Sequence, residues 1–127
     1  MVAIARKTNA VCWIDLPVMD LDRAIAFYSA VLGEPVTKEI ERGCQMGILP
    51  HAQGVSGSLF VSGDNEPGKT GPLIYLSVEG RLGAAVDAVR TFGGEVLVGR
   101  QPIAPYGFRA IVVDSEGNRI ALHSQAP

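Results

Sequence analysis

The sequence predicts a mixed α+β fold built from two copies of a strand–helix–three-strand unit. Apolar residues recur at three- and four-residue spacing over about 21–32 and 82–92, and each stretch follows a short β-rich run. Three further strand-like segments follow each stretch. The leading strands also repeat one another, since Ile14 and Ile74 stand at equivalent places 60 positions apart. In a chain of 127 residues this repeat predicts one domain, 1–127, composed of two βαβββ modules.

The first module is expected over about residues 8–62 and begins with a strand at about 10–18. Asp20 can cap the following helix, because its carboxylate can accept hydrogen bonds from the first backbone amides. Gly33 can end that helix in the left-handed conformation. Three strands are then expected at 35–41, 44–49 and 55–61.

A stretch rich in glycine and proline, about 63–71, is expected to link the two modules. The second module, about 72–125, repeats the order with a strand at 73–78 and a helix that ends at Gly93. Its last three strands are expected at 95–99, 107–113 and 118–124. The last two are joined by the turn Asp114-Ser-Glu-Gly117.

Composition and charge disfavour several classes of function. The formal net charge is −2 and the basic residues are scattered, so no basic surface for nucleic acid or anionic lipid is expected. No apolar segment follows Arg6 and Lys7, and no window of about 18 uncharged apolar residues occurs. We therefore expect a cytoplasmic protein with no nucleic-acid partner and no membrane. Cys12 and Cys44 lack the spacing of a metal site and are expected to be buried free thiols.

Two segments carry a family resemblance. Residues 16–33 read Leu-Pro-Val-Met-Asp-Leu-Asp-Arg-Ala-Ile-Ala-Phe-Tyr-Ser-Ala-Val-Leu-Gly, and residues 114–122 read Asp-Ser-Glu-Gly-Asn-Arg-Ile-Ala-Leu. The first resembles the opening strand and helix, and the second the closing hairpin, of the glyoxalase, bleomycin-resistance and dioxygenase (vicinal-oxygen-chelate) superfamily. The closest resemblance is to small bacterial glyoxalase-like proteins. It implies that the modules form a curved mixed sheet, a cup with the helices outside and the ligand inside.

Metal-dependent members of this superfamily hold a divalent ion with His, Gln or Glu side chains from the first and last strands of each module. In this sequence those positions are occupied by Trp13, Phe60, Leu73 and Ala121. None of these side chains has an atom that coordinates such an ion. We therefore expect no metal and no other cofactor. A metal held elsewhere, for example by Asp15, His51 and His123, stays an alternative.

Side chains that share a face with these four positions complete the expected cup. Alternation along the strands adds Asp15, Tyr75, Ser77, Arg119 and His123. A mostly apolar cup with a few polar groups is typical of a small-molecule pocket. The candidate ligand contacts are therefore Trp13, Phe60, Leu73, Tyr75, Arg119 and Ala121. The alternative is that the aromatic side chains fill the cup and leave no cavity.

Two residues are candidates for catalysis, Asp15 and His123. A carboxylate on a central strand would be desolvated unless a base such as Arg119 paired with it, and it can act as a general base or anchor a cationic ligand. The alternatives are a structural carboxylate and a solvent-exposed histidine. Tyr106 and Phe108 lie in a loop of the second module and are candidate contacts at the mouth of the cup, unless that loop is a packed turn.

These observations lead to the hypothesis of a metal-free protein that binds a small, mostly apolar or amphipathic molecule in the cup. The resemblance also implies a homodimer. The first alternative is an enzyme of the same superfamily, a lyase, isomerase or dioxygenase acting on a small metabolite. Without a metal it would be an acid/base isomerase that uses Asp15, Tyr75 or His123. The second alternative is an interaction module with a filled cup.

Overall fold

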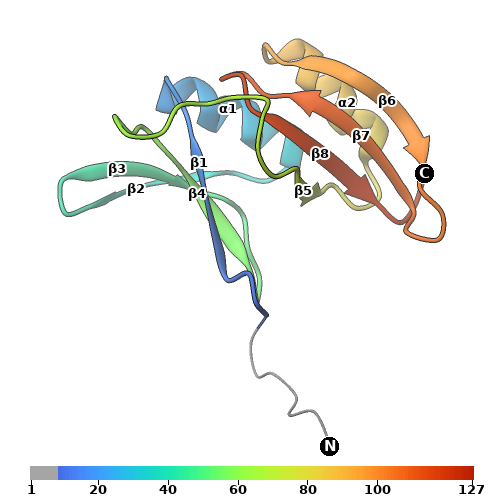
Figure 1. Ribbon diagram of the computed structural model, residues 1–127, viewed down its shortest axis with the longest axis horizontal. Coiled ribbons are helices and arrows are strands. Elements are labelled where there is room, and N and C mark those ends of the chain that lie inside the picture. Colours follow the sequence, from blue (N-terminus) through green and yellow to red (C-terminus); the bar gives the residue numbers. More distant parts are fainter. Residues whose placement is uncertain (1–8) are drawn as a thin grey trace, which may run out of the picture.

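The protein is described by a computed structural model over residues 9–127 (Figure 1). Arg6 and Lys7, and residue 8 of the expected first module, lie outside the described residues. The first module comprises β1 (Trp13–Pro17), α1 (Leu21–Leu32), β2 (Thr37–Glu41), β3 (Cys44–Ile48) and β4 (Ser56–Phe60). The second comprises β5 (Ile74–Ser77), α2 (Leu82–Thr91), β6 (Glu95–Pro102), β7 (Phe108–Val113) and β8 (Arg119–Ser124).

The strands form two mixed four-stranded sheets with the same topology. Their orders are β1-β4-β3-β2 and β5-β8-β7-β6. In each sheet the first strand of the module runs parallel to the last, and the other neighbours are antiparallel. The predicted α+β fold of two βαβββ modules is thus confirmed. One boundary of the second sheet differs clearly from expectation: β6 continues beyond residue 99 to Pro102, and its register against β7 is irregular over this stretch.

Helix α1 begins and ends where its sequence predicts. The Asp20 side chain accepts a hydrogen bond from the Arg23 amide at 3.0 Å, and Gly33 adopts φ 76° at the C-terminus. Phe27 is fully buried. The predicted apolar stripe did not include it and consisted of Leu21, Ala24, Ile25, Tyr28, Val31 and Leu32. The Phe27 ring faces the second module, since a Cβ added to Gly94 would lie 2.8 Å from Phe27 Cε2. Helix α1 therefore buries two faces, one against the sheet of its own module and one against the second module.

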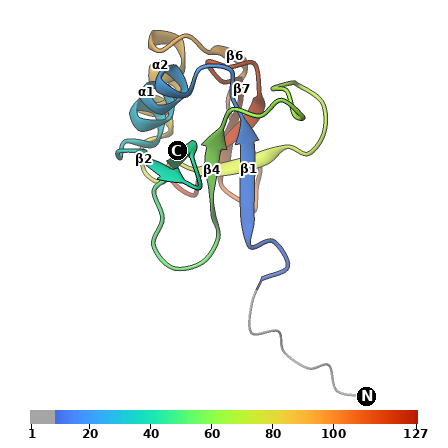
Figure 2. The same cartoon turned by 90° about the vertical axis from the view of Figure 1, so that its left-hand side faces the viewer.

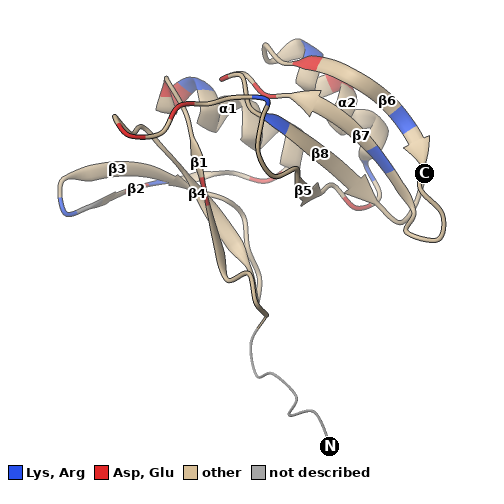
Figure 3. Cartoon of the chain, in the orientation of Figure 1, with Lys and Arg blue, Asp and Glu red and all other residues tan. Residues whose placement is uncertain are grey.

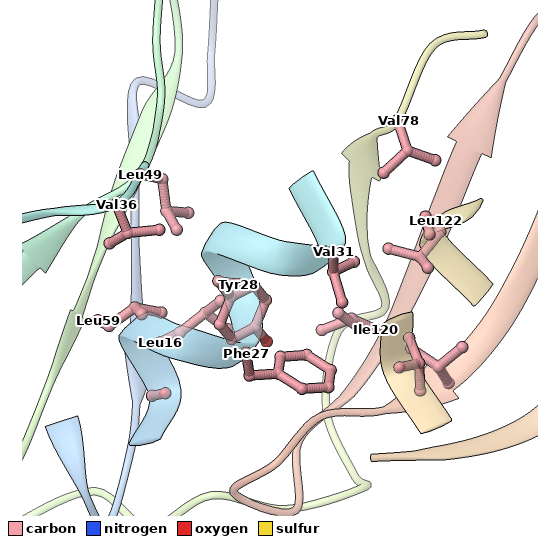
Figure 4. Close-up of a cluster of buried hydrophobic side chains, with 14 of the residues drawn as sticks. Leu16, Phe27, Tyr28, Val31, Val36, Leu49, Leu59, Val78, Ile120 and Leu122 are labelled. Atoms are coloured by element: carbon pink, nitrogen blue, oxygen red, sulfur yellow. The ribbon is translucent and has the colours of Figure 1, made fainter. Parts of the chain in front are cut away.

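The two helices lie side by side on the same side of the sheets (Figures 1 and 2). A single cluster of buried apolar side chains spans both modules. In Figure 4, Leu16, Leu59 and other side chains of the first module lie on one side of α1, with Ile120 and Leu122 of the second module on the other. This shared core fixes the position of one module relative to the other.

The opposite faces of both sheets are open. Trp13 on β1 and Tyr75 on β5 are each 46% exposed on these faces. Cys12 and Cys44 are free and exposed, so the expectation of buried thiols was wrong. Both stand at strand ends, where the core does not reach. Within residues 9–127 no helix has the length and apolar character needed to cross a membrane.

Candidate functional site

Three polar side chains meet on the open face of the second sheet. Tyr75 comes from β5, Arg109 from β7 and His123 from β8, and the strand register places all three on one face. Arg109 Nη1 donates a hydrogen bond to the Tyr75 hydroxyl, and Arg109 Nε donates to Gln101 Oε1 at 2.9 Å. The Arg109 guanidinium carbon also lies 5.9 Å from the centroid of the Tyr75 ring, within cation–π range. These contacts hold the Tyr75 ring in one orientation.

His123 stands beside Tyr75 in an edge-to-face arrangement. The ring centroids are 6.4 Å apart and the planes meet at 65°. His123 Nε2 lies 2.5 Å from the backbone oxygen of Tyr106. A carbonyl oxygen only accepts hydrogen bonds, so His123 Nε2 carries the proton in this contact. The other ring nitrogen, Nδ1, takes no part in it.

Tyr75 lines two hollows. The first has a volume of about 360 Å³ and is bounded by Tyr75, Ile103, Tyr106 and His123. The second, about 490 Å³, lies between the modules, and its walls include Tyr75 and Ser77 as well as Ile14, His51, Val55 and Ser56. Volumes of this size suit a small organic molecule. Aromatic and aliphatic side chains dominate the first hollow, with the imidazole of His123 as its polar group.

Asp15 is exposed and stands on β1, an edge strand of its sheet, so the expectation of a desolvated carboxylate on a central strand was wrong. Its hydrogen-bond partners lie within its own sheet. Its Oδ1 accepts hydrogen bonds from Trp13 Nε1 at 3.0 Å and from Ser58 Oγ at 2.7 Å. None of the ion pairs within residues 9–127 joins Asp15 to Arg119. Both residues instead line a third hollow, separate from the two that contain Tyr75. The structure thus divides the predicted site residues into two groups.

The other predicted contacts are dispersed. Ala121 is fully buried beside Tyr75, and Leu73, which immediately precedes β5, is partly buried. Phe60 is partly buried on the open face of the first sheet. Phe108 packs against the core, on the helix side of the second sheet. The structure brings together Tyr75, Tyr106 and His123, while Trp13, Phe60 and Phe108 line neither hollow at Tyr75 nor the hollow at Asp15.

Sequence reasoning missed Arg109 and Gln101. The β7–β8 hairpin could have identified Arg109, because Val113 pairs with Arg119 in that hairpin. Counting four positions from that pair along each strand brings Arg109 opposite His123. Gln101 had no such signal, because the β6–β7 register is irregular between Val98 and Gln101.

The residues at the positions that the family resemblance assigns to metal ligands do not fit a divalent ion. Trp13, Phe60, Leu73 and Ala121 present indole, phenyl, isobutyl and methyl groups. Over the described part of the chain, no three His, Cys, Asp or Glu side chains gather as a metal site would require. This donor set gives no basis for a reaction step through a metal at those positions.

Comparison with known proteins agrees with this fold. A search of curated protein sequences finds no match. A glyoxalase/bleomycin resistance protein from Albidiferax ferrireducens T118 superposes with a TM-score of 0.72 at 15% identity, covering 91% of this chain and 98% of its own. A glyoxalase-related enzyme from Fulvimarina pelagi gives a TM-score of 0.67 at 15% identity, with 90% and 86% covered. A superfamily member from Sphaerobacter thermophilus DSM 20745 gives 0.65 at 19% identity, with 91% and 97% covered.

The sequence itself carries the family pattern. Residues 10–122 match the model of the Glyoxalase/Bleomycin resistance protein/Dioxygenase superfamily. That match spans both modules, including Tyr75, Arg109 and the β7–β8 hairpin. The chain therefore belongs to the Glyoxalase/Bleomycin resistance protein/Dioxygenase superfamily.

Proposed function

We propose that this protein binds a small, mostly apolar or amphipathic molecule on the open face of its second sheet, without a metal. The observation that carries the proposal is that Tyr75 lines both adjoining hollows and is held in place by Arg109. An aromatic wall that is already fixed loses little side-chain entropy when a ligand binds. The absence of donor atoms at the four metal-ligand positions supports binding by side chains alone.

The chemistry of the walls supports an amphipathic ligand. Tyr75, Ile103 and Tyr106 supply apolar contact area, and aromatic side chains supply much of it at low entropic cost. His123 provides an imidazole in the wall of this hollow, and Arg109, which is hydrogen-bonded to the Tyr75 hydroxyl, provides a positive charge next to Tyr75. A molecule with an apolar or aromatic body and one hydrogen-bond acceptor would match both features.

We also propose that the protein forms a homodimer in the cytoplasm. Trp13 and Val98 are exposed on the open sheet faces, and a second copy would cover such apolar surface. Two free, exposed cysteines favour a reducing compartment. Sedimentation equilibrium tests the dimer, because a protein of 13.4 kDa that stays monomeric at high concentration contradicts it.

Dye binding tests the proposed site. Anilinonaphthalene sulfonate is small, aromatic and amphipathic, and we expect a saturable rise in its fluorescence with the folded protein. Tyr106→Ala removes a side chain that is 69% exposed and should weaken dye binding about tenfold. The matched control is Phe92→Ala, which removes an aromatic side chain, 43% exposed, at the end of α2. Equal dye binding by both variants would show that the dye occupies another surface.

The second candidate function is a metal-free isomerase or lyase. The observation that favours it is that His123 and Tyr75, two side chains able to transfer protons, line the same hollow. Metabolites that displace the dye are the candidate substrates, and NMR spectroscopy follows whether they are converted. Turnover that His123→Gln abolishes would establish the enzyme. If metabolites displace the dye and none of them is converted, the result favours a binding protein.

A further inference from the structure

The third hollow lies between the modules, where β1 ends and β5 and β8 begin. It has a volume of about 270 Å³, and its walls come from β1, from the linker between β4 and β5, and from the start of β8. Figure 3 marks acidic positions in this linker and a basic position at the start of β8. No residue that lines this hollow lines either hollow at Tyr75. It is therefore a separate place in the molecule, and the binding proposed above does not use it.

Hydrogen bonds between distant segments hold the walls of this hollow. The Gly68 oxygen accepts a hydrogen bond from the Arg119 amide at 3.2 Å, and the Gly68 amide donates to Asn118 Oδ1 at 3.2 Å. Asn118 Nδ2 in turn donates to the backbone oxygen of Pro17 at 2.8 Å. The linker, β8 and β1 are thereby tied together around the hollow. Its shape is set by the fold before any ligand arrives.

Arg119 brings a buried hydrogen-bond donor to this hollow. Its Nε is buried and has no hydrogen-bond partner among the described residues. Its Nη2 makes one long contact, 3.4 Å, to the backbone oxygen of Gly71. A buried donor without a partner is costly, and an arginine satisfies its donors best with a carboxylate, which accepts two parallel hydrogen bonds.

Asp15 brings the opposite charge to the same hollow. Its two hydrogen bonds, from Trp13 and Ser58, both end on Oδ1. Oδ2 accepts no hydrogen bond from any group within residues 9–127. Glu66 adds a second carboxylate from the linker. The ion pairs of the described chain include neither Asp15 nor Arg119, so charges of both signs line one hollow without neutralising each other directly.

We propose that this hollow binds a small zwitterion, a molecule with one carboxylate and one ammonium group, as in short amino acids. Arg119 binds the carboxylate through its terminal nitrogens, of which Nη2 lies in an exposed part of the side chain, while Nε stays buried. Asp15 binds the ammonium through Oδ2, with Glu66 adding negative charge on that side. A volume of about 270 Å³ lies at the lower end of ligand pockets, which favours a small occupant.

A matched set of probes tests this proposal on the full chain. Glycine, β-alanine and γ-aminobutyrate differ only in the spacing of the two charges, while propionate and propylamine each carry one. The readout is the Arg119 Nε–H signal in heteronuclear NMR spectra, assigned by its loss in Arg119→Lys. We expect at least one of the amino acids to bind about tenfold more tightly than either single-charge probe.

Variants separate the two charges. Arg119→Lys and Asp15→Asn should each weaken amino-acid binding about tenfold, and Asn can keep the acceptor that Trp13 and Ser58 use. Because Arg119→Lys lacks the Nε–H signal, its binding and that of the parent are compared by isothermal titration calorimetry. Arg100→Lys, an exposed position on β6, is the control and should bind as the parent does. No saturable shift with any amino acid overturns the proposal, and so does propionate binding of equal strength. Dye binding at Tyr75 is measured in parallel, so either site can fail without the other.

Discussion

The Tyr28 hydroxyl donates a 2.5 Å hydrogen bond to Asp114 Oδ2, which joins α1 in the first module to the β7–β8 turn in the second. Both residues are buried. Asp114 also accepts hydrogen bonds from the Glu116 and Asn118 amides at 2.8 Å and from Asn118 Nδ2 at 3.0 Å. Burial, followed by the charge and hydrogen bond of Asp114, raises the pKa of Tyr28 well above 10. The hydroxyl therefore stays a donor, and the bond contributes to the fixed placement of the modules.

Replacing Tyr28 by Phe should lower the free energy of unfolding by about 1–3 kcal/mol, because the buried Asp114 carboxylate loses a donor while the ring keeps its packing. Urea denaturation followed by circular dichroism measures the loss. Tyr106→Phe is the control, since that side chain is 69% exposed in a loop, and its effect should stay within about 0.5 kcal/mol. If both variants are equally stable, the Tyr28–Asp114 hydrogen bond does not contribute to the placement of the modules.

Glu116 makes a second tie between the same turn and the start of α1. Its Oε1 accepts hydrogen bonds from the Met19 and Asp20 amides at 2.9 and 2.8 Å, and its Oε2 accepts one from Arg23 Nε at 2.7 Å. The Glu116 side chain is inaccessible to solvent, whereas that of Arg23 is half-exposed. Burial by itself would raise the pKa of Glu116. The hydrogen bonds from Arg23, Asp20, Ser115 and Met19 outweigh it and lower the pKa from 4.5 to about 2.

This lowered pKa predicts a loss of stability in acid. Between pH 4.5 and 2 the unfolded chain binds a proton at Glu116 that the folded chain does not, so stability falls as the pH falls through this window. Glu116→Gln should be less stable than the parent above pH 4.5, by on the order of 1 kcal/mol because Arg23 is open to solvent. The difference should shrink towards pH 2. Urea denaturation at a series of pH values measures it, with the exposed Glu95→Gln as control; a difference that is constant with pH would contradict the assignment.

Gly33, at the end of α1, lies against Arg81, which immediately precedes α2. It ends α1 at φ 76°, and a Cβ added there would lie 2.7 Å from Arg81 Cζ. That guanidinium donates a hydrogen bond to the Val31 oxygen at 2.7 Å, so it cannot move away without losing this contact. Gly33→Ala should therefore cost about 1 kcal/mol for the backbone and about 1 kcal/mol more for the displaced arginine.

The control for Gly33→Ala is Gly80→Ala. Gly80 has φ 77°, but a Cβ added there meets no atom of the described residues within 4 Å. Gly80→Ala should therefore lower the stability only by the backbone contribution, about 1 kcal/mol. Thermal denaturation of both variants gives the comparison, and equal losses would mean that Arg81 adjusts without cost.

The elements of this fold could be predicted because their signals are local. Apolar spacing placed both helices, Asp20 and Gly33 marked the ends of α1, and the repeat gave the second module. Features that depend on contacts between segments could not be predicted in this way. Phe27 is buried because the second module covers the side of α1 that a lone βαβββ module would leave open. Cys44 is exposed because β3 begins away from the core.

The candidate site shows the same division. Alternation along single strands placed Tyr75 and His123 on one face, as the structure has them. Which residue of β7 stands beside them depends on the register set by the 114–118 turn, and Arg109 was missed for that reason. Asp15 was considered as a partner of Arg119, but a strand pattern does not show that Ser58, the register partner of Asp15 on β4, supplies a closer hydroxyl.

Metal content tests the absence of suitable donors at the superfamily's ligand positions. The side chains of Trp13, Phe60, Leu73 and Ala121 cannot coordinate a divalent ion, so we expect protein purified without chelator or metal-affinity resin to contain far less than one ion per chain. Elemental analysis by mass spectrometry measures this. Dialysis against Zn²⁺ or Ni²⁺, with the thermal midpoint read before and after, is the control, since an ion bound only to the folded state would raise the midpoint. The contrary result would be one tightly held ion per chain whose removal lowers the thermal midpoint. It would mean that other side chains of this protein bind the ion, and metal-dependent lyase or dioxygenase chemistry would become the leading function.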